Sequence, residues 1–407
     1  MHILFLTDNF PPEGNAPATR TFEHACEWVN KGHKVTVITC APNFPEGKVF
    51  EGYKNKWLSK QKIEGINVWR VKTFITANQG FVKRIIDFIS FMFSSLFFGL
   101  FTQKVDIVIG TSPQFFTVIS AWALAKFKRI PFVFELRDIW PASITAVGVL
   151  KGSWIIKILE KLELFLYRQA DLIISVTHSF KFELQKRGVS AGKIRVVLNG
   201  VNLERYSPLQ EKDESLANKY GLKNKFVIGY IGTHGLAHAL ENVIEAAGLI
   251  EKEDNIRIVF VGGGADRSRL EKIVHEDRLQ NVVMIPRQAK DQMSQVWSLC
   301  DISLVHLKDA PLFKTVIPSK IFESMAMGLP ILMAMPIGEA TDIIEEHKAG
   351  INVSPGCPKQ LSEKFLELAK DKELVRTLSC QSLNAARNFD RKKLALEMLN
   401  HLEEIVS

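Results

Sequence analysis

Short apolar runs alternate with longer helical patterns through the first half of the chain. Strands are predicted at Ile3–Thr7, Lys34–Thr39, Val68–Val71, Asp106–Gly110, Phe132–Glu135, Leu172–Val176 and Ile194–Leu198. The helical patterns between them include Thr19–Asn30, Phe116–Phe127, Trp154–Arg168 and Ser179–Lys186. Strands separated by helices predict right-handed βαβ units and a parallel sheet that is covered on both faces.

The same rhythm starts again after a polar, turn-rich stretch at 199–224. The second set of predicted strands is Phe226–Ile231, Arg257–Val261, Val282–Ile285, Ile302–Val305, Ile331–Met333 and Gly350–Val353. We therefore predict an α/β protein with two domains that each contain a parallel sheet, residues 1–200 and 201–390. The amphipathic helix predicted within 391–407 could belong to either domain, and packing back on the first is one possibility.

One segment, residues 81–103, departs from this pattern. Sixteen consecutive residues from Phe88 to Gln103 are uncharged, and 7 of the 27 phenylalanines lie between Phe81 and Phe101. A helix over these sixteen residues would be about 24 Å long, shorter than the roughly 30 Å of a bilayer core. We expect it to lie on the cytoplasmic face of a membrane, while a buried helix is the competing interpretation.

Length and composition narrow the class of protein. A chain of 407 residues with 46% hydrophobic and 24% charged residues is too long for one small domain and too apolar for a disordered chain. Residues 1–200 carry 26 Lys and Arg against 15 Asp and Glu, a net charge of +11, whereas the remainder carries 26 against 29, a net charge of −3. This asymmetry indicates that the first half faces something anionic.

Cysteine usage and the start of the chain indicate the compartment. The 5 cysteines are scattered and include no C-x-x-C pair, which argues against a disulfide framework or a zinc site. The opening residues Met1–Asp8 have no basic lead and only a short apolar run, so a buried first strand is predicted instead of a signal peptide. We therefore expect a cytoplasmic protein.

The segment after the first predicted strand, Asp8–Arg20, is a candidate anion-binding loop. Ligands of open α/β sheets bind at the carboxyl ends of strands, where helix N-termini offer free N–H groups. Gly14 and Asn15 would let the backbone approach a phosphate or an acceptor, and Arg20 would add positive charge. A turn without a ligand is the alternative. Because no G-x-G-x-x-G follows this strand, a nicotinamide or flavin enzyme is disfavoured.

The second half contains two glycine-rich turns and one stronger motif. Gly232 and Gly263 lie in turns after successive predicted strands, where together they could hold a nucleotide. The segment Pro318–Pro330 has the stronger signal: Ser319 is a plausible N-cap, and Glu323 follows one turn into an otherwise apolar helix. A carboxylate in such a position needs partners, which a ribose with two adjacent hydroxyls would supply. A surface pair between Glu323 and Lys320 is the alternative.

These residues resemble a known family, the retaining glycosyltransferases of family 4. The segments that carry the resemblance are Asp8–Arg20, Glu135–Pro141, Asn199–Asn202 and Pro318–Pro330, which together span nearly the whole chain. The family has the GT-B fold, in which two Rossmann-like domains face each other across a cleft. The closest resemblance is to bacterial L-fucosamine transferases, which act on N-acetylamino sugars in O-antigen or capsule assembly.

The resemblance also implies roles in donor binding. Glu323 matches the second glutamate of the family's E-x7-E motif, which binds the donor ribose, but Thr315 stands where the first glutamate would be. The Arg and Lys that many members place around the donor diphosphate are replaced here by Thr233 and His238. Lys320, Arg287 or Lys314 is expected to supply the missing charge, since an uncompensated diphosphate in a crevice would be costly.

In the first domain the family often has a catalytic histidine near the segment Glu135–Pro141. This chain has Arg137 and Asp138 there, so Asp138 or Glu135 is the candidate for that place. A carboxylate could stabilise an oxocarbenium-like state or help to deprotonate the acceptor. An Arg137–Asp138 pair that only holds a loop is the alternative, and His178 is a weaker catalytic candidate.

The expected function is transfer of a sugar from a UDP-linked donor to a saccharide on a polyprenyl-diphosphate carrier. The resemblance implies retention of anomeric configuration, no metal ion and no cofactor beyond the nucleotide sugar. Two alternatives remain: a GT-B-fold UDP-GlcNAc 2-epimerase-like isomerase, and a catalytically inactive membrane-associated assembly protein. Nucleic-acid binding is disfavoured, because no interleaving of aromatic and basic residues supports it.

Overall fold

The computed structural model describes residues 1–44, 46–76, 81–139 and 154–406. The chain divides into two compact units, which are treated separately here: unit 1 is Met1–Leu198 with Arg391–Ser407, and unit 2 is Asn199–Asp390. Each unit has its own sheet and its own buried apolar clusters. Both are Rossmann-like α/β units of the kind that make up the GT-B fold, as the sequence predicts.

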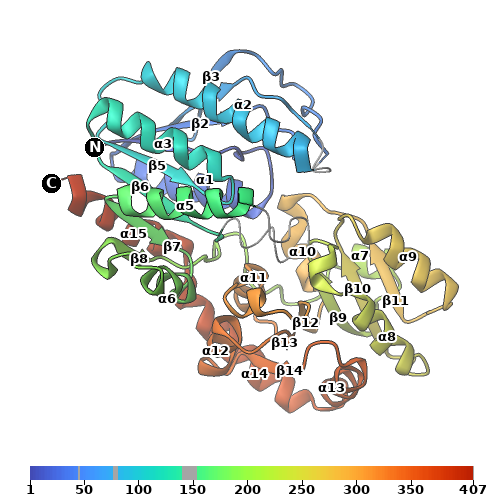
Figure 1. Ribbon diagram of the computed structural model, residues 1–407. Helices are drawn as coiled ribbons and strands as arrows, with labels where there is room; N and C mark the ends of the chain where they lie inside the picture. The colour runs from blue at the N-terminus through green and yellow to red at the C-terminus, as the bar shows by residue number, and fades with distance from the viewer. Residues whose placement is uncertain (45, 77–80, 140–153, 407) are drawn as a thin grey trace. The chain divides into compact units, whose positions relative to one another are not determined.

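The sheet of unit 1 has the strand order β3-β4-β2-β1-β5-β6-β7-β8 (Figure 1). Its strands are β1 (His2–Leu6), β2 (Lys34–Cys40), β3 (Leu58–Ile63), β4 (Ile66–Val71), β5 (Ile107–Thr111), β6 (Phe132–Leu136), β7 (Leu172–Ser175) and β8 (Ile194–Val196). Its helices are α1 (Ala16–Asn30), α2 (Phe81–Leu100), α3 (Phe115–Lys128), α5 (Trp154–Gln169), α6 (His178–Lys186) and α15 (Arg391–Val406).

Strand β3 is absent from the sequence-based prediction, and it pairs antiparallel with β4. Its sequence, Leu-Ser-Lys-Gln-Lys-Ile, is too polar to be distinguished from a loop by hydrophobic pattern alone. The turn Glu64-Gly65 joins the two strands, with φ values of 46° and 80°. Two successive positive φ values are typical of a tight hairpin turn, so the chain reverses here and covers the edge of the parallel sheet.

The last helix, α15, belongs to unit 1, where it packs on α1. The indole Nε1 of Trp28 donates to the carbonyl of Ala395 at 2.8 Å, and Glu23 and Arg391 form an ion pair. Trp28 is fully buried and shares an apolar cluster with Leu402. The C-terminal residues therefore complete the core of the first unit.

Helix α2 contains the phenylalanine-rich segment, and it packs against α3. Phe91 is fully buried, and a Cβ on Gly99 would lie 2.5 Å from a methyl group of Leu124, so the two helices are in close contact. Phe91 therefore belongs to the core of unit 1 and is not part of an exposed face. Phe93, Phe97 and Phe101 are 62%, 57% and 61% exposed, and they lie on the opposite face of the helix.

Unit 2 is a wholly parallel sheet of order β11-β10-β9-β12-β13-β14. Its strands are β9 (Phe226–Ile231), β10 (Ile256–Val261), β11 (Val282–Ile285), β12 (Ile302–His306), β13 (Ile331–Ala334) and β14 (Gly350–Val353). Its helices are α7 (Glu214–Lys219), α8 (Glu241–Leu249), α9 (Arg267–Glu276), α10 (Met293–Ser298), α11 (Lys320–Ala326), α12 (Glu339–Glu346), α13 (Pro358–Lys370) and α14 (Lys372–Ala386).

Candidate functional site

Two glycine turns meet at the carboxyl edge of the unit 2 sheet. Strands β9 and β10 are parallel neighbours, so the turns that follow them leave the sheet side by side. Gly262 has a φ of 145°, and a Cβ there would lie 1.9 Å from the carbonyl oxygen of Gly232. The amide of His234 donates to the carbonyl of Gly263 at 2.9 Å. The close approach of the two backbones explains why position 262 needs a glycine.

Lys320, from the first turn of α11, extends to the first of these turns. Its Nζ lies 3.5 Å from the ring centroid of Tyr230, and a Cβ on Gly232 would lie 2.9 Å from it. This Nζ is buried and has no hydrogen-bond partner. Burial lowers the pKa of Lys320 to about 7, although the nearby Glu323 carboxylate acts in the opposite direction. The structure thus brings together two motifs that are about ninety residues apart in the sequence.

Three histidines surround the same turn without adding positive charge. Burial is the main cause that lowers the pKa of His234 to about 4 and that of His238 to about 3, and the charge of Lys320 lowers both further. His306, at the end of β12, places its Nδ1 2.7 Å from the carbonyl oxygen of His238. Because both ring pKa values lie well below 7, neither His234 nor His238 is a cation at neutral pH.

The segment before α11 holds the other predicted donor-binding residues. Ser319 is the N-cap residue, as predicted, and its side chain makes no capping hydrogen bond. Its carbonyl instead accepts from the amide of Phe322 at 3.2 Å. The Thr315 hydroxyl donates to the carbonyl of Leu312 at 2.9 Å. Glu323 is half-buried and lies one turn into the helix, as its spacing predicts.

The two other predicted cations and the exposed threonine lie at the surface. Arg287 follows β11 and Lys314 ends a short 3-10 turn at Pro311–Lys314, and both side chains are exposed. Thr233 is also exposed, and its carbonyl accepts from the Tyr230 hydroxyl at 2.8 Å. Among the predicted cations, Lys320 is therefore the one whose charged group is removed from solvent.

In unit 1 the structure assigns different roles to Arg20 and Glu135 from those expected. Arg20 Nε lies 2.9 Å from Glu135 Oε1, and both side chains are almost completely buried. The same guanidinium donates to the carbonyls of Leu198 and Val197 at 2.7 and 3.1 Å. Arg20 therefore does not add its charge to a solvent-facing loop, and Glu135 Oε1 is engaged in a buried ion pair. Burial opposes ionisation of Glu135, but the charges of Arg20 and Arg137 keep its pKa below the ordinary value.

Arg137 is a candidate that the sequence analysis treated only as a loop residue. Its backbone amide donates to the hydroxyl of Ser112 at 2.8 Å, which fixes the backbone just beyond β6. Its Nη1 is buried without a hydrogen-bond partner. Burial lowers the pKa of Arg137 to about 10, so the side chain still carries a full positive charge at neutral pH. A buried guanidinium nitrogen without a hydrogen-bond partner is costly unless an acceptor completes it.

The remaining predicted residues of unit 1 lie at the same carboxyl edge or on neighbouring elements. The amide of Asp138 donates to the Ser112 hydroxyl at 3.3 Å, beside Arg137. His178 is exposed at the start of α6. Asn15 caps α1, accepting from the amide of Ala18 at 3.0 Å, and Gly14 is exposed just before it. The end of the motif Glu135–Pro141, namely 140–141, lies outside the described residues.

Comparison with known proteins gives the class of protein. Residues 212–383 match the family model described as "Glycosyl transferases group 1", and residues 18–205 match that described as "Glycosyltransferase Family 4". The putative colanic acid biosynthesis glycosyl transferase WcaI of Escherichia coli is 30% identical over 337 residues, which is 81% of this chain and 82% of that protein. The chain therefore belongs to the glycosyltransferases, with a group 1 and a family 4 domain, and it is an enzyme of that class.

One further relative agrees with this assignment, and one solved structure agrees with the fold. The probable glycosyltransferase WbjE of Pseudomonas aeruginosa is 25% identical over 272 residues, covering 66% of this chain and 67% of that protein. Among solved structures, HepE of Anabaena in complex with UDP-glucose superposes with a TM-score of 0.74 at 17% identity, covering 99% of this chain and 100% of that one. The latter likeness supports the GT-B fold.

Two kinds of feature are absent from the described residues. No helix there is long and apolar enough to cross a bilayer. No group of three or more His, Cys, Asp or Glu side chains in the same part of the chain is arranged to hold a metal ion.

Proposed function

We propose that this glycosyltransferase moves a sugar from a UDP-linked donor to a saccharide carried on polyprenyl diphosphate, with retention of configuration and without a metal ion. The observation that carries the proposal is the buried, unpartnered Nζ of Lys320 beside the Gly232 turn. The resemblance to L-fucosamine transferases favours an N-acetylamino sugar. The relatives named for colanic acid biosynthesis favour a role in bacterial surface polysaccharide, such as O-antigen or capsule.

Unit 2 is proposed to bind the donor. A diphosphate at the Gly232 and Gly263 turns would give Lys320 the anionic partner that it lacks, and charge-assisted hydrogen bonds of this kind are strong. Glu323, one turn further along α11, would then accept hydrogen bonds from the ribose. Because His234 and His238 are neutral, the positive charge at these turns comes from Lys320 and from Arg267, whose Nη1 already donates to the carbonyls of Gly262 and Ile285. Lys320, whose Nζ has no hydrogen-bond partner, is the one proposed to take the place of the Arg and Lys expected of the family. HepE, which has been solved with UDP and with UDP-glucose, supports UDP as the carrier.

Unit 1 is proposed to bind the acceptor and to contribute the group at the reaction centre. Asp138 is the candidate there, because Glu135 is committed to Arg20. Arg137, with its unpartnered Nη1, is suited to an anionic group of the acceptor, such as its diphosphate. His178, exposed at the start of α6, is retained as a weaker candidate. A carboxylate at the centre would stabilise positive charge that develops on the donor sugar.

The exposed face of α2 is proposed to dock unit 1 on the cytoplasmic leaflet of the cell membrane. Phe93, Phe97 and Phe101 recur every four residues and are exposed, and the ring centroids of Phe97 and Phe101 lie 5.3 Å apart. Ser94 Oγ donates to the carbonyl of Lys72 at 2.6 Å, which brings a basic residue to the margin of this face. Apolar burial together with attraction between basic residues and anionic lipid, about 1 kcal/mol for each Lys or Arg, favours an interfacial position.

Labelled UDP-sugars incubated with the protein, with and without a polyprenyl-diphosphate-linked saccharide, test the proposal. Acceptor-dependent movement of label into the lipid fraction is the expected result. Conversion of UDP-GlcNAc to its epimer without an acceptor would instead indicate an isomerase. If every UDP-sugar tested and the acceptor remain unchanged, the protein is an inactive assembly protein.

A further inference from the structure

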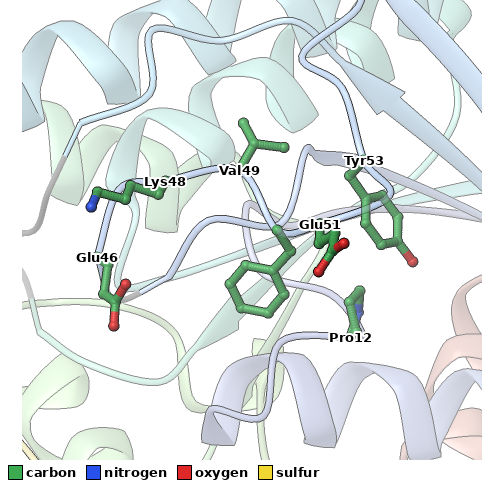
Figure 2. A pocket seen from close by; sticks show the side chains of 7 residues that line it. Pro12, Glu46, Lys48, Val49, Glu51 and Tyr53 are labelled. Atoms are coloured by element: carbon green, nitrogen blue, oxygen red, sulfur yellow. The ribbon is translucent and has the colours of Figure 1, made fainter.

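A cavity of about 570 Å³ lies beside the predicted anion-binding loop of unit 1. It is lined by Pro12, Glu46, Lys48, Val49, Phe50, Glu51 and Tyr53 (Figure 2). Pro12 follows β1, and the other six residues belong to the connection between β2 and β3. Because β1 and β2 are parallel neighbours, both connections leave the sheet at its carboxyl edge, where open α/β sheets bind their ligands.

Buried polar groups hold the walls of this cavity in place. Arg70 is only 4% exposed, donates to the carbonyls of Cys40 and Pro11, and lies over the ring of Tyr53 at 5.0 Å. This guanidinium therefore joins the two connections that form the cavity. The carboxylate of Glu13 makes a second set of contacts between the same two connections.

Glu13 anchors the start of the connection between β2 and β3. Its Oε1 accepts from the amides of Asn43 and Phe44 at 2.7 and 2.9 Å, and the side chain is 3% exposed. Within the connection, the amide of Phe50 donates to Pro42 and the amide of Tyr53 donates to Phe50, at 2.9 and 3.1 Å. These bonds fix the wall before any ligand arrives, so little ordering cost is left for binding.

The lining combines the two kinds of group that recognise a sugar ring. Phe50, Tyr53 and Pro12 offer apolar surface for the C–H face of a pyranose, while the carboxylates of Glu46 and Glu51 accept hydrogen bonds from adjacent hydroxyls. Among the lining residues, two carboxylates against the single ammonium of Lys48 leave a net negative charge, while the guanidinium of Arg70 lies over Tyr53 and is 4% exposed. The cavity therefore disfavours a uronic acid or a phosphate, and its volume lies within the range of small-molecule sites, about 300–1,000 Å³.

We infer that this cavity is a subsite for a neutral or amino sugar of the acceptor saccharide, with Glu51 and Phe50 as its specificity-determining residues. The inference rests on the proposed function, in which unit 1 binds the acceptor. It places one sugar residue of that acceptor in this cavity. The net negative charge of the lining disfavours binding of the acceptor diphosphate in this cavity. The sugar residue held here is thus distinct from the phosphate-bearing end of the carrier.

Saturation-transfer NMR on the full-length protein tests the subsite with four probes: the methyl glycosides of galactose, N-acetylglucosamine, glucosamine and glucuronic acid. Transfer to at least one of the neutral or amino glycosides is expected, with the glucuronide at least 5-fold weaker. The signal should fall at least 5-fold in Glu51→Gln and in Phe50→Ala. Glu64→Gln is the matched control, since it changes an exposed glutamate in the β3–β4 turn at the amino end of β4, and it should leave the signal unchanged.

Several results would overturn the subsite. These are no transfer to any probe, equal transfer in wild type and Glu51→Gln, or a preference for the glucuronide. If Phe50→Ala fails to fold, the conservative Glu51→Gln variant alone decides. The two proposals fail in different ways. If the glycosides bind in a Glu51-dependent manner but the protein transfers no sugar, the proposed function fails and the subsite stands. If the protein transfers sugar and Glu51→Gln leaves the KM for the acceptor unchanged, the subsite fails and the proposed function stands.

Discussion

Replacing Lys320 with Met tests the donor site most sharply, because it removes one buried charge and keeps the shape of the side chain. In the free protein the Nζ has no hydrogen-bond partner, and its pKa is about 7. A hydrogen bond to a charged group contributes about 1.5–3 kcal/mol. The variant should therefore bind UDP about 12- to 150-fold more weakly, since 1.4 kcal/mol corresponds to a factor of ten.

Isothermal calorimetry with UDP and with uridine separates the contribution of the Lys320 charge to the binding free energy from that of the other contacts in the site. Uridine carries no phosphate, so its affinity should be almost the same in wild type and Lys320→Met. Lys272→Met is a matched control in the same unit, because its exposed Nζ is remote from the Gly232 turn and pairs only with Glu276 at 3.6 Å. Equal losses for uridine and UDP would refute the reasoning and favour Arg287 or Lys314 as the phosphate-binding cation.

The same residue predicts two effects of pH. A pKa of about 7 means that Lys320 is about half protonated at pH 7 in the free protein, so UDP binding should take up a fraction of a proton, measurable in buffers of different ionisation enthalpy. The unfolded chain, with a lysine pKa near 10.5, binds more protons than the folded one between pH 7 and 10.5. The Lys320 contribution to the free energy of unfolding should therefore rise with pH over this window, and Lys320→Met should lack it.

Three further outcomes are expected. Glu323→Gln should lose about 1.5–3 kcal/mol of donor binding or transition-state stabilisation with an unchanged melting temperature, and wild-type turnover would exclude the ribose contact. Serine at Phe93, Phe97 and Phe101 should release the protein from anionic liposomes while UDP affinity is kept; continued co-sedimentation would contradict membrane docking. Glu135→Gln should lower the free energy of unfolding in urea by about 3–5 kcal/mol at pH 7, because it leaves a buried guanidinium unpaired. The wild-type protein should lose this difference as the pH falls through the lowered pKa of Glu135, and an equal stability at pH 7 would exclude a structural ion pair.

The sequence predicted the alternation of strands and helices well, because buried parallel strands are continuous apolar runs. It missed β3, whose polar sequence is stabilised by pairing with β4 and by its turn. It also did not reveal the ion pair between Arg20 and Glu135, since this pair joins residues 115 positions apart and leaves no local signal. The burial of this pair depends on the tertiary structure, in which α1 and β6 lie close together.

In the donor site, too, the sequence predicts the features that depend on neighbouring residues, but not the contacts between residues far apart in the chain. The segment Pro318–Pro330 was recognisable from its glutamate, glycine and prolines, and the glycine turns from their position after strands. That Lys320 lies against Gly232 and Tyr230 depends on how α11 packs on the sheet, which no spacing along the chain encodes. The cavity at residues 46–53 was likewise invisible, because Arg70 and Glu13 build it from a different strand and a different loop.

The most direct test of the account is the fate of the anomeric carbon of the donor. A UDP-sugar labelled with ¹³C at C1 is incubated with the protein and a polyprenyl-diphosphate-linked saccharide, and the one-bond carbon–hydrogen coupling of the product is measured by NMR. The account predicts a new glycosidic bond at the labelled carbon with the anomeric configuration of the donor. Label that stays on UDP or is released as free sugar, or a product of inverted configuration, would contradict it.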